Sequence, residues 1–377
     1  MERQESYLQT AEKLIAGYYG KMPFSNYIKL YFASNKKFGS RDRRQISTLC
    51  FCFFRTSNLP AKSLRESIII SAFLCTDEKW SFYSDVFLNY ANKTTDEKFA
   101  LLNYSKDDLF KFKNFLSPEI DKIKYSSSYL NQPNLYLRIR PGFNRKVISV
   151  FEKNNIGFEI ENDCISLPPS IKVQELFSVN KEVVVQDKNS QKVLDYFSKI
   201  QLPLNFKVWD CCAASGGKSI LLSDKVKYKF QLFVSDVRQS ILIKLKQRFK
   251  EAVIQPQKIF AADLSKPYRS NEKYDLIICD APCSGSGTWQ RTPEQQYFFK
   301  EKMLNDYSQL QKHIISNSLP ALKKGGFFFY ITCSVFEKEN EENVKYIESN
   351  FDLKLLHKEY LKGYMQKADT LFVAIFS

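Results

Sequence analysis

The chain has 377 residues with 44% hydrophobic and 26% charged side chains, a length that is too great for one ordinary core and predicts two or three domains. Lys and Arg outnumber Asp and Glu by 56 to 41. The resulting net charge of +15 favours a polyanionic partner such as nucleic acid, although a lysine-rich proteome, in which the excess serves only solubility, is the alternative.

Cysteine and histidine usage argues against a metal site, because nine cysteines form no Cys-x-x-Cys pair and there are only two histidines. The first residues have no signal-peptide pattern, and no stretch approaches the roughly 18 apolar residues of a membrane span. We therefore expect a cytoplasmic monomer with reduced thiols, no membrane attachment and no metal.

Residues 7–122 predict a helical bundle, because apolar side chains recur at spacings of three and four. Ser40 is the expected N-cap of a helix whose first turn, residues 41–44 (RDRR), is basic. Basic residues oppose the helix macrodipole at that end. An RNA phosphate near this turn is one interpretation, and a salt bridge to another helix is the other.

The pattern changes after residue 131. Segments 135–139 and 157–160 are typical of strands and flank a predicted helix over 145–153. Strands and helices then alternate to the last residue. The predicted domains are a helical domain at 1–125, a small α/β module at 126–175 and a larger α/β domain at 176–377.

Residues 206–210 predict a strand, followed by a turn of small residues and a helix that begins near Ile220. This order is typical of a nucleotide-binding turn, where glycine lets the backbone approach the ligand. A P-loop is excluded because Cys212 stands where G-x-x-x-x-G-K-S requires glycine, and the G-x-G-x-x-G order of dinucleotide sites is absent.

Acidic residues follow three predicted strands, at Asp236, Asp263 and Asp280. The carboxyl ends of parallel strands meet at one edge of a sheet, so we expect these carboxylates to converge on one cleft, with Asp236 accepting both ribose hydroxyls of a nucleoside. Helix N-capping is the alternative role for an isolated aspartate after a strand.

Two cysteines lie beyond the ends of predicted strands. Cys283 is in a Pro/Gly/Ser loop and Cys333 follows an aromatic strand, whereas Cys279 lies inside an apolar run and reads as structural. One thiolate can add to a pyrimidine ring and a second group can undo the adduct. We expect both thiols to open onto the cofactor cleft.

Trp289 and Arg291 follow the Cys283 loop. A tryptophan there can stack on a splayed base while an arginine pairs with phosphate, as single-stranded RNA recognition requires. A hinge packed under the following helix is the alternative, and the sequence does not decide between them.

Residues 210–218 (DCCAASGGK), Asp236, Asp263, residues 280–285 (DAPCSG) and 332–334 (TCS) occur in the order and spacing of the Sun/Fmu (NOL/NOP/Sun) RNA cytosine-5 methyltransferases. The chain resembles this family over about residues 176–377. Weaker similarity covers residues 185–191, a NusB-like helical domain around 40–55 and a small RNA-binding module around 137–139.

The resemblance implies a class I (Rossmann-like) methyltransferase domain, S-adenosyl-L-methionine as cofactor, and RNA as partner, most of all 16S ribosomal RNA, with transfer RNA as the alternative. It implies Cys333 as the nucleophile at carbon 6 of cytosine, Cys283 in release of the product, Asp280 on the cytosine edge and Lys218 beside the thiolate. The implied cofactor-binding residues are Cys212, Ala213, Ala214, Ser215, Gly216, Gly217, Lys218, Asp236, Asp263 and Asp280.

Two positions depart from the family pattern. Ser215 replaces a proline that would pre-set the turn, which predicts a roughly two- to five-fold loss of cofactor affinity. Arg140 stands where the small module of the family usually has asparagine, and the helical domain looks short, so we expect the RNA target to differ from that of the bacterial relative in this family.

Two other functions are weighed. A DNA-type cytosine-5 methyltransferase would explain residues 342–344 (ENV), but these follow the TCS motif on a charged segment, 337–342, that we expect to be a solvated face. An inactive assembly factor would be expected to lack one thiol or one strand-end acid, and all of them are present.

Overall fold

The computed structural model describes residues 2–377, which form two compact units that are treated separately here. The first unit comprises residues 2–116, 120–132 and 288–301, and the second comprises 117–119, 133–287 and 302–377. The three predicted domains stay a prediction. Within residues 2–377, no helix is both long and apolar enough to cross a membrane.

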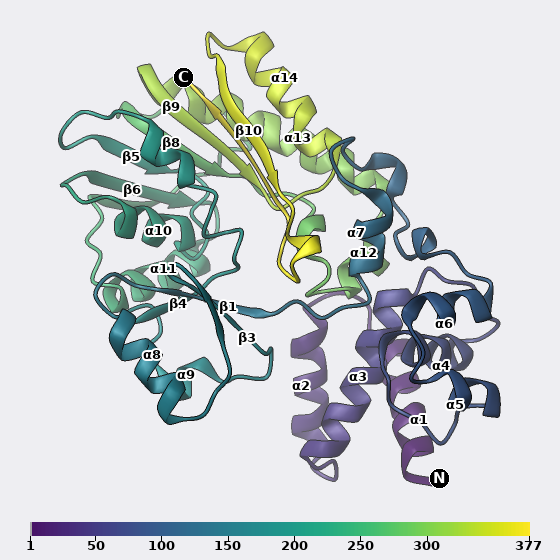
Figure 1. Ribbon diagram of the computed structural model, residues 1–377. Helices are drawn as coiled ribbons and strands as arrows, with labels where there is room; N and C mark the ends of the chain where they lie inside the picture. Colours follow the sequence, from purple (N-terminus) through teal and green to yellow (C-terminus); the bar gives the residue numbers. More distant parts are fainter. Residues whose placement is uncertain (1) are drawn as a thin grey trace. The chain divides into compact units, whose positions relative to one another are not determined.

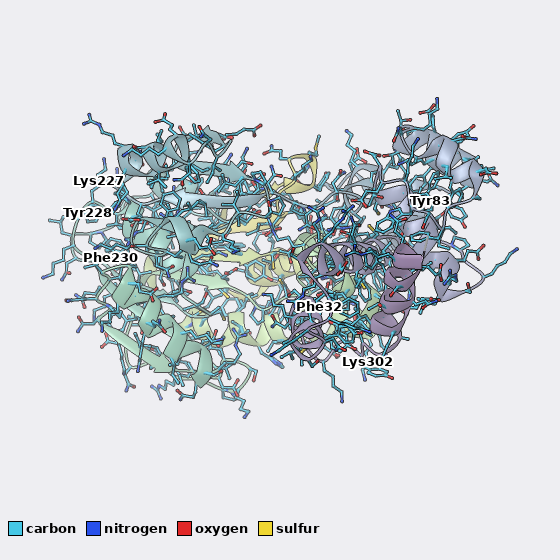
Figure 2. The ribbon with its side chains drawn as sticks, turned by 90° about the horizontal axis from the view of Figure 1, so that it is seen from below. Phe32, Tyr83, Lys227, Tyr228, Phe230 and Lys302 are labelled. Atoms are coloured by element: carbon cyan, nitrogen blue, oxygen red, sulfur yellow. The ribbon has the colours of Figure 1, made fainter. Side chains whose placement is uncertain are left out.

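The first unit is helical, which confirms the N-terminal helical region (Figure 1). Helices α1 and α3 pack together, as do α3 and α4, around an aromatic-rich core that includes Phe32 and Tyr83 (Figure 2). Its helices are α1 (Glu2–Ala16), α2 (Phe24–Ser34), α3 (Ser40–Thr56), α4 (Leu64–Cys75), α5 (Asp85–Tyr90), α6 (Thr95–Leu102), α7 (Lys122–Ser128) and α12 (Glu294–Phe298).

Helix α3 begins differently from the prediction, because its N-cap is Gly39 and not Ser40. The carboxylate of Asp42 accepts a hydrogen bond from the Gly39 N–H at 2.9 Å and pairs with Arg3 of α1 at 2.7 Å. These contacts, together with the hydroxyl of Tyr7, lower the pKa of Asp42 to about 2. An acid thus offsets part of the positive charge of the first turn, and the two interpretations of its arginines stay predictions.

The second unit contains a four-stranded antiparallel sheet in the order β2-β3-β1-β4. The sequence pattern located β1 and most of β2 but missed the short strands β3 and β4. The elements of this region are β1 (Leu135–Ile139), α8 (Asn144–Lys153), β2 (Glu159–Glu161), β3 (Cys164–Leu167), α9 (Val173–Leu176) and β4 (Val183–Val185).

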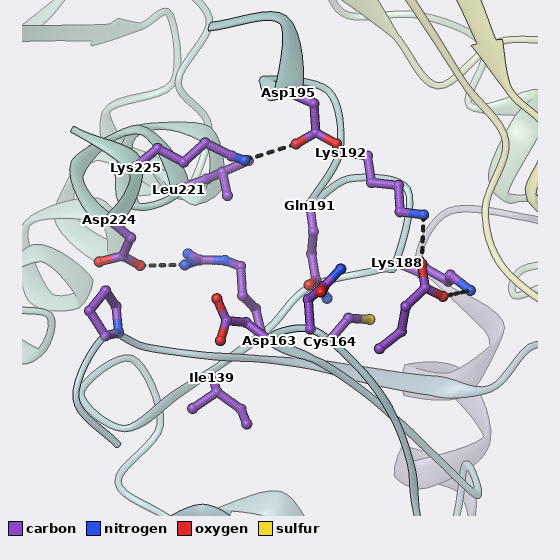
Figure 3. A pocket seen from close by; sticks show the side chains of 14 residues that line it. Ile139, Asp163, Cys164, Lys188, Gln191, Lys192, Asp195, Leu221, Asp224 and Lys225 are labelled. Carbon is purple, nitrogen blue, oxygen red and sulfur yellow. Dashed lines mark hydrogen bonds and ion pairs between the residues drawn. The ribbon is translucent and has the colours of Figure 1, made fainter. Parts of the chain in front are cut away.

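Two arginines tie the small sheet to helix α10 (Gly217–Lys225). Arg138 and Arg140 both bind the carboxylate of Asp224 on that helix, and Arg140 also donates to the carbonyls of Asn180 and Ala252. Figure 3 shows the Asp224 contact at the edge of a cavity of about 200 Å³. Arg140 therefore has a structural role, and the expectation of a different RNA target stays a prediction.

The larger sheet has seven strands in the order β10-β11-β9-β8-β5-β6-β7. Strands β5 to β9 are parallel neighbours and β11 runs antiparallel to β9 and β10, which gives the predicted Rossmann-like α/β fold. The strands are β5 (Lys207–Asp210), β6 (Gln231–Asp236), β7 (Lys258–Ala261), β8 (Tyr274–Asp280), β9 (Leu322–Thr332), β10 (Leu355–Leu361) and β11 (Leu371–Phe376).

Helices α10 and α11 (Gln239–Glu251) cover the sheet through a cluster of aliphatic side chains such as Leu221 and Leu245. The connection from α10 to β6 carries Lys227, Tyr228 and Phe230 (Figure 2). Helices α13 (Glu301–Ser318) and α14 (Glu341–Asn350) are joined by a 2.7 Å hydrogen bond between Ser316 and Tyr346. This framework places the carboxyl ends of β5, β6 and β8 at one edge.

Candidate active site

The turn after β5 requires glycine at position 216. Its φ is +83°, and a Cβ there would lie 2.6 Å from a ring carbon of Phe249. The same turn holds Ala214 at φ 46°, where its N–H donates to Asp236 at 3.0 Å. Close packing on α11 and the bond to β6 therefore set the shape of this loop.

Ser215, which replaces the family proline, is held by a contact that the sequence did not suggest. Arg248 on α11 donates to the Ser215 hydroxyl at 2.7 Å and to its carbonyl at 3.0 Å. The guanidinium also donates to Asn180 at 3.0 Å, so it is itself fixed. A side-chain tether thus takes the place of proline stiffness, and the predicted loss of cofactor affinity stays a prediction.

A pocket of about 590 Å³ opens beside this turn. Seven predicted residues line it: Cys212, Ala214, Asp236, Asp263, Asp280, Cys283 and Cys333. Five predicted cofactor residues do not line it: Ala213, Ser215, Gly216, Gly217 and Lys218. Apolar side chains that sequence reasoning missed complete the wall: Val237, Leu264, Leu310 and Ile314. The last two lie on α13, whose apolar periodicity was the available signal.

Asp236 ends β6 and faces the pocket, but its acceptor positions are engaged. In addition to the Ala214 N–H, it accepts bonds from the backbone and the guanidinium of Arg238 at 2.9 to 3.1 Å. Burial raises the pKa of Asp236, and the bonds from Arg238 and Ala214 outweigh that effect and lower it. A ribose can bind both carboxylate oxygens only if the guanidinium of Arg238, which is 57% exposed, swings away.

The two predicted reactive thiols meet at the pocket. Strands β8 and β9 are parallel neighbours with Asp280 opposite Ile331, so the loops beyond them are adjacent. The Cys283 and Cys333 sulfurs lie 3.3 Å apart, and both residues are half-buried. Contact with Cys333, burial and the charge of Glu339 raise the pKa of the Cys283 thiol.

Lys218 interacts with residues on both sides of the predicted catalytic site. Its ammonium group pairs with Asp280 at 2.8 Å, and its side chain is 15% exposed. Burial lowers the pKa of Lys218, but the charges of Asp280, Cys333 and Asp210 outweigh burial and raise it. Lys218 is therefore within electrostatic range of both Asp280 and Cys333.

Three further thiols form a cluster at the ends of β5 and β8. The sulfurs of Cys211, Cys212 and Cys279 all lie within 4.8 Å of one another. Thiol hydrogen bonds from the other two cysteines lower the pKa of Cys212 to about 5. Three sulfurs can in principle hold a thiophilic ion, which is a geometry that the spacing of these cysteines did not suggest. The absence of a metal stays a prediction.

The burial of Trp289 decides between the two interpretations of that residue, and the burial of acids within residues 337–342 contradicts a prediction. Trp289 is 1% exposed and packs against Phe110, Phe112 and Phe299, which fits the packed hinge and not a stacking platform. The prediction of a solvated face over 337–342 is wrong. Glu339, Glu341 and Asn343 are all buried, because hydrogen-bond partners from several elements replace water.

Comparison with known proteins fits this geometry. Residues 201–371 match the family model of the 16S rRNA methyltransferases RsmB/F. The resemblance to the Sun/Fmu family is confirmed. Ribosomal RNA small subunit methyltransferase B of Enterobacter sp. (strain 638) is 28% identical over 222 residues, which is 56% of this chain. The chain spans half the length of that relative.

Solved structures agree on the fold. The crystal structure of PH0851 matches with a TM-score of 0.69 at 17% identity and covers 97% of each chain. NSun6 from Pyrococcus horikoshii, solved with SFG, matches with a TM-score of 0.61 at 14% identity and covers 71% of this chain and 96% of its own. At these identities the likeness shows the fold alone.

Proposed function

We propose that this protein transfers a methyl group from S-adenosylmethionine to carbon 5 of a cytosine in RNA, with 16S ribosomal RNA as the target. The observation that carries the proposal is the pair of thiols 3.3 Å apart at a pocket bordered by three strand-end acids. The RsmB/F match over residues 201–371 supports both the reaction and the choice of ribosomal RNA.

The residues present suit S-adenosylmethionine. A volume of about 590 Å³ is in the range of cofactor pockets, roughly 300–1,000 Å³. Asp236 would hold the ribose hydroxyls, while Val237, Leu264 and Ile314 offer an apolar slot for adenine. The bound cofactor supplies an electrophilic methyl group. SFG, a cofactor analogue, is present in the NSun6 structure with the same fold.

Carbon 5 of cytosine is a poor nucleophile, so the reaction needs covalent activation. We assign this step to Cys333, whose thiolate forms a bond to carbon 6 and makes carbon 5 electron-rich. Carbon 5 then takes the methyl group, which leaves S-adenosylhomocysteine, and gives its proton to a base. The bond between carbon 6 and the Cys333 sulfur breaks and returns the thiolate. Lys218 stabilises that thiolate, and Asp280 holds the cytosine edge.

We assign the release step to Cys283. Its raised pKa keeps this thiol protonated near neutral pH, while the neighbouring sulfur attacks. Once this thiol has given its own proton to solvent, its thiolate, a strong base because of the raised pKa, can take the proton from carbon 5. The two cysteines therefore have unequal roles despite their contact.

Two variants test the assignment. Cys333→Ala is expected to abolish methyl transfer, and Cys283→Ala to accumulate a covalent complex with labelled RNA that survives a denaturing gel. Cys164→Ala is the matched control, because this thiol lies on β3 and does not line the pocket. A trapped complex in the Cys333 variant would reverse the two roles.

The target and the cofactor need separate experiments. Bisulfite mapping of ribosomal and transfer RNA from a deletion strain is expected to show one lost 5-methylcytosine in 16S ribosomal RNA. Loss in transfer RNA alone would replace the target and keep the chemistry. No binding of millimolar S-adenosylmethionine in calorimetry would instead favour an inactive assembly factor.

A further inference from the structure

A single buried carboxylate connects the two cysteine loops. Glu339 lies in a 3-10 turn, Glu337–Glu339, that follows the Cys333 loop, and it is 0% exposed. It accepts hydrogen bonds from the Ser284 N–H at 2.8 Å, the Ser284 hydroxyl at 2.5 Å and the Ser334 hydroxyl at 2.5 Å. These serines directly follow Cys283 and Cys333, so one side chain fixes both loops.

The carboxylate is itself firmly placed. Gln311 on α13 donates to it at 3.0 Å. The backbone carbonyl of Glu339 accepts from Tyr330 at 2.7 Å and from Asn343 at 3.1 Å. Contacts from β9, α13 and α14 therefore hold both ends of this residue, and buried hydrogen bonds of this kind restrict motion.

The Glu339 contacts lie one residue from each thiol, in loops whose sulfurs are 3.3 Å apart. Cys333 must reach carbon 6 of the base while Cys283 stays beside it, and loops beyond strand ends move unless they are tethered. A further link between the same loops is the 2.8 Å bond from the Gly287 N–H to the Cys333 carbonyl. That link involves only backbone. The Ser286 hydroxyl adds side-chain links to Ser334 at 3.2 Å and to the Val335 N–H at 2.9 Å, and Glu339 is the charged side chain among these connections.

We propose that Glu339 is a positioning residue that holds the Cys283 and Cys333 loops in the geometry required for attack and release. The inference rests on the proposed function, which it deepens by adding a residue outside the pocket lining. The negative charge also contributes to the raised pKa of Cys283, so its loss is expected to make that thiol more reactive.

The test uses Glu339→Gln in the full-length protein. Glutamine keeps the shape, but its NH₂ group donates and cannot accept from the serine hydroxyls. We expect kcat to fall about ten- to hundred-fold, as misplaced reacting groups typically cause, with KM for RNA and cofactor unchanged within error. Alkylation of Cys283 by iodoacetamide, followed by mass spectrometry across pH 6 to 9, is expected to shift to lower pH.

Glu341→Gln is the matched control. Glu341 is also buried and also accepts hydrogen bonds, but from Ser117 and Tyr360 and not from Ser284 or Ser334. We expect its kcat and its Cys283 alkylation profile to match the unmodified protein. Equal losses in the two glutamine variants, or an unchanged kcat and alkylation profile in Glu339→Gln, would overturn the inference.

Two further variants test the inference if Glu339→Gln does not fold. Ser284→Ala and Ser334→Ala each remove a hydroxyl contact with Glu339 and leave the carboxylate in place. Each is expected to lower kcat without changing KM, and unchanged kcat in both would also overturn the inference. If the unmodified protein methylates no RNA, the proposed function fails, whereas the alkylation profiles still decide the role of Glu339.

Discussion

Replacing Ser215 with the family proline should destabilise this particular protein. Proline at a compatible position stabilises by about 0.4–1 kcal/mol, because it restricts the unfolded chain. The substitution also removes the 2.7 Å bond from Arg248 to the Ser215 hydroxyl. A hydrogen bond to a charged group contributes about 1.5–3 kcal/mol. The net expected loss is about 0.5–2.6 kcal/mol, obtained by pairing the extremes of these two ranges.

Urea unfolding of Ser215→Pro, Ser215→Ala and the unmodified protein measures this difference. Ser215→Ala isolates the hydroxyl, so it should lose more stability than the proline variant. In an Arg248→Met background the tether is already absent, and Ser215→Pro should then stabilise by about 0.4–1 kcal/mol. A proline variant that is more stable than the unmodified protein would refute the role given to Arg248.

Two other predictions concern acids at strand ends, Asp210 on β5 and Asp236 on β6. Burial raises the pKa of Asp210 from 3.8 to about 7. The folded state therefore holds this proton more tightly, and stability should fall by about 4 kcal/mol as pH rises from 4 to above 7. In urea unfolding, Asp210→Asn should flatten the dependence of the free energy of unfolding on pH over this range. The same dependence in the variant and the unmodified protein would contradict the assignment of this effect to Asp210. Arg238→Ala frees Asp236 from an exposed ion pair worth about 0.2–1 kcal/mol, so calorimetry should show S-adenosylmethionine binding up to about five-fold tighter. Unchanged or weaker binding would mean that Arg238 does not compete with the ribose.

Much of the site was predictable, because its signals are local. Small residues after a strand, acids at strand ends and a cysteine in a Pro/Gly/Ser loop each depend on a few neighbouring positions. Parallel strands then bring such positions to one edge of a sheet. The meeting of Asp236, Asp280, Cys283 and Cys333 at one pocket follows from that rule.

Other features depended on partners that are distant in sequence. Arg140 binds Asp224, and their residue numbers differ by 84. The residue numbers of Arg248 and Ser215 differ by 33, and those of Glu339 and Ser284 differ by 55. The charged side chains of residues 337–342 predicted a solvated face, because acids are mostly exposed unless they have a partner, and a distant partner cannot be identified from the sequence.

The amino-acid sequence by itself determined the order of the elements and which residues reach the cofactor edge, because periodicity and turn chemistry act over a few residues. Only the tertiary structure decided how those residues are held. It buried Trp289 and Glu339, tethered Ser215 and placed two sulfurs 3.3 Å apart. Buried polar groups need specific partners, and only the folded chain brings those partners together.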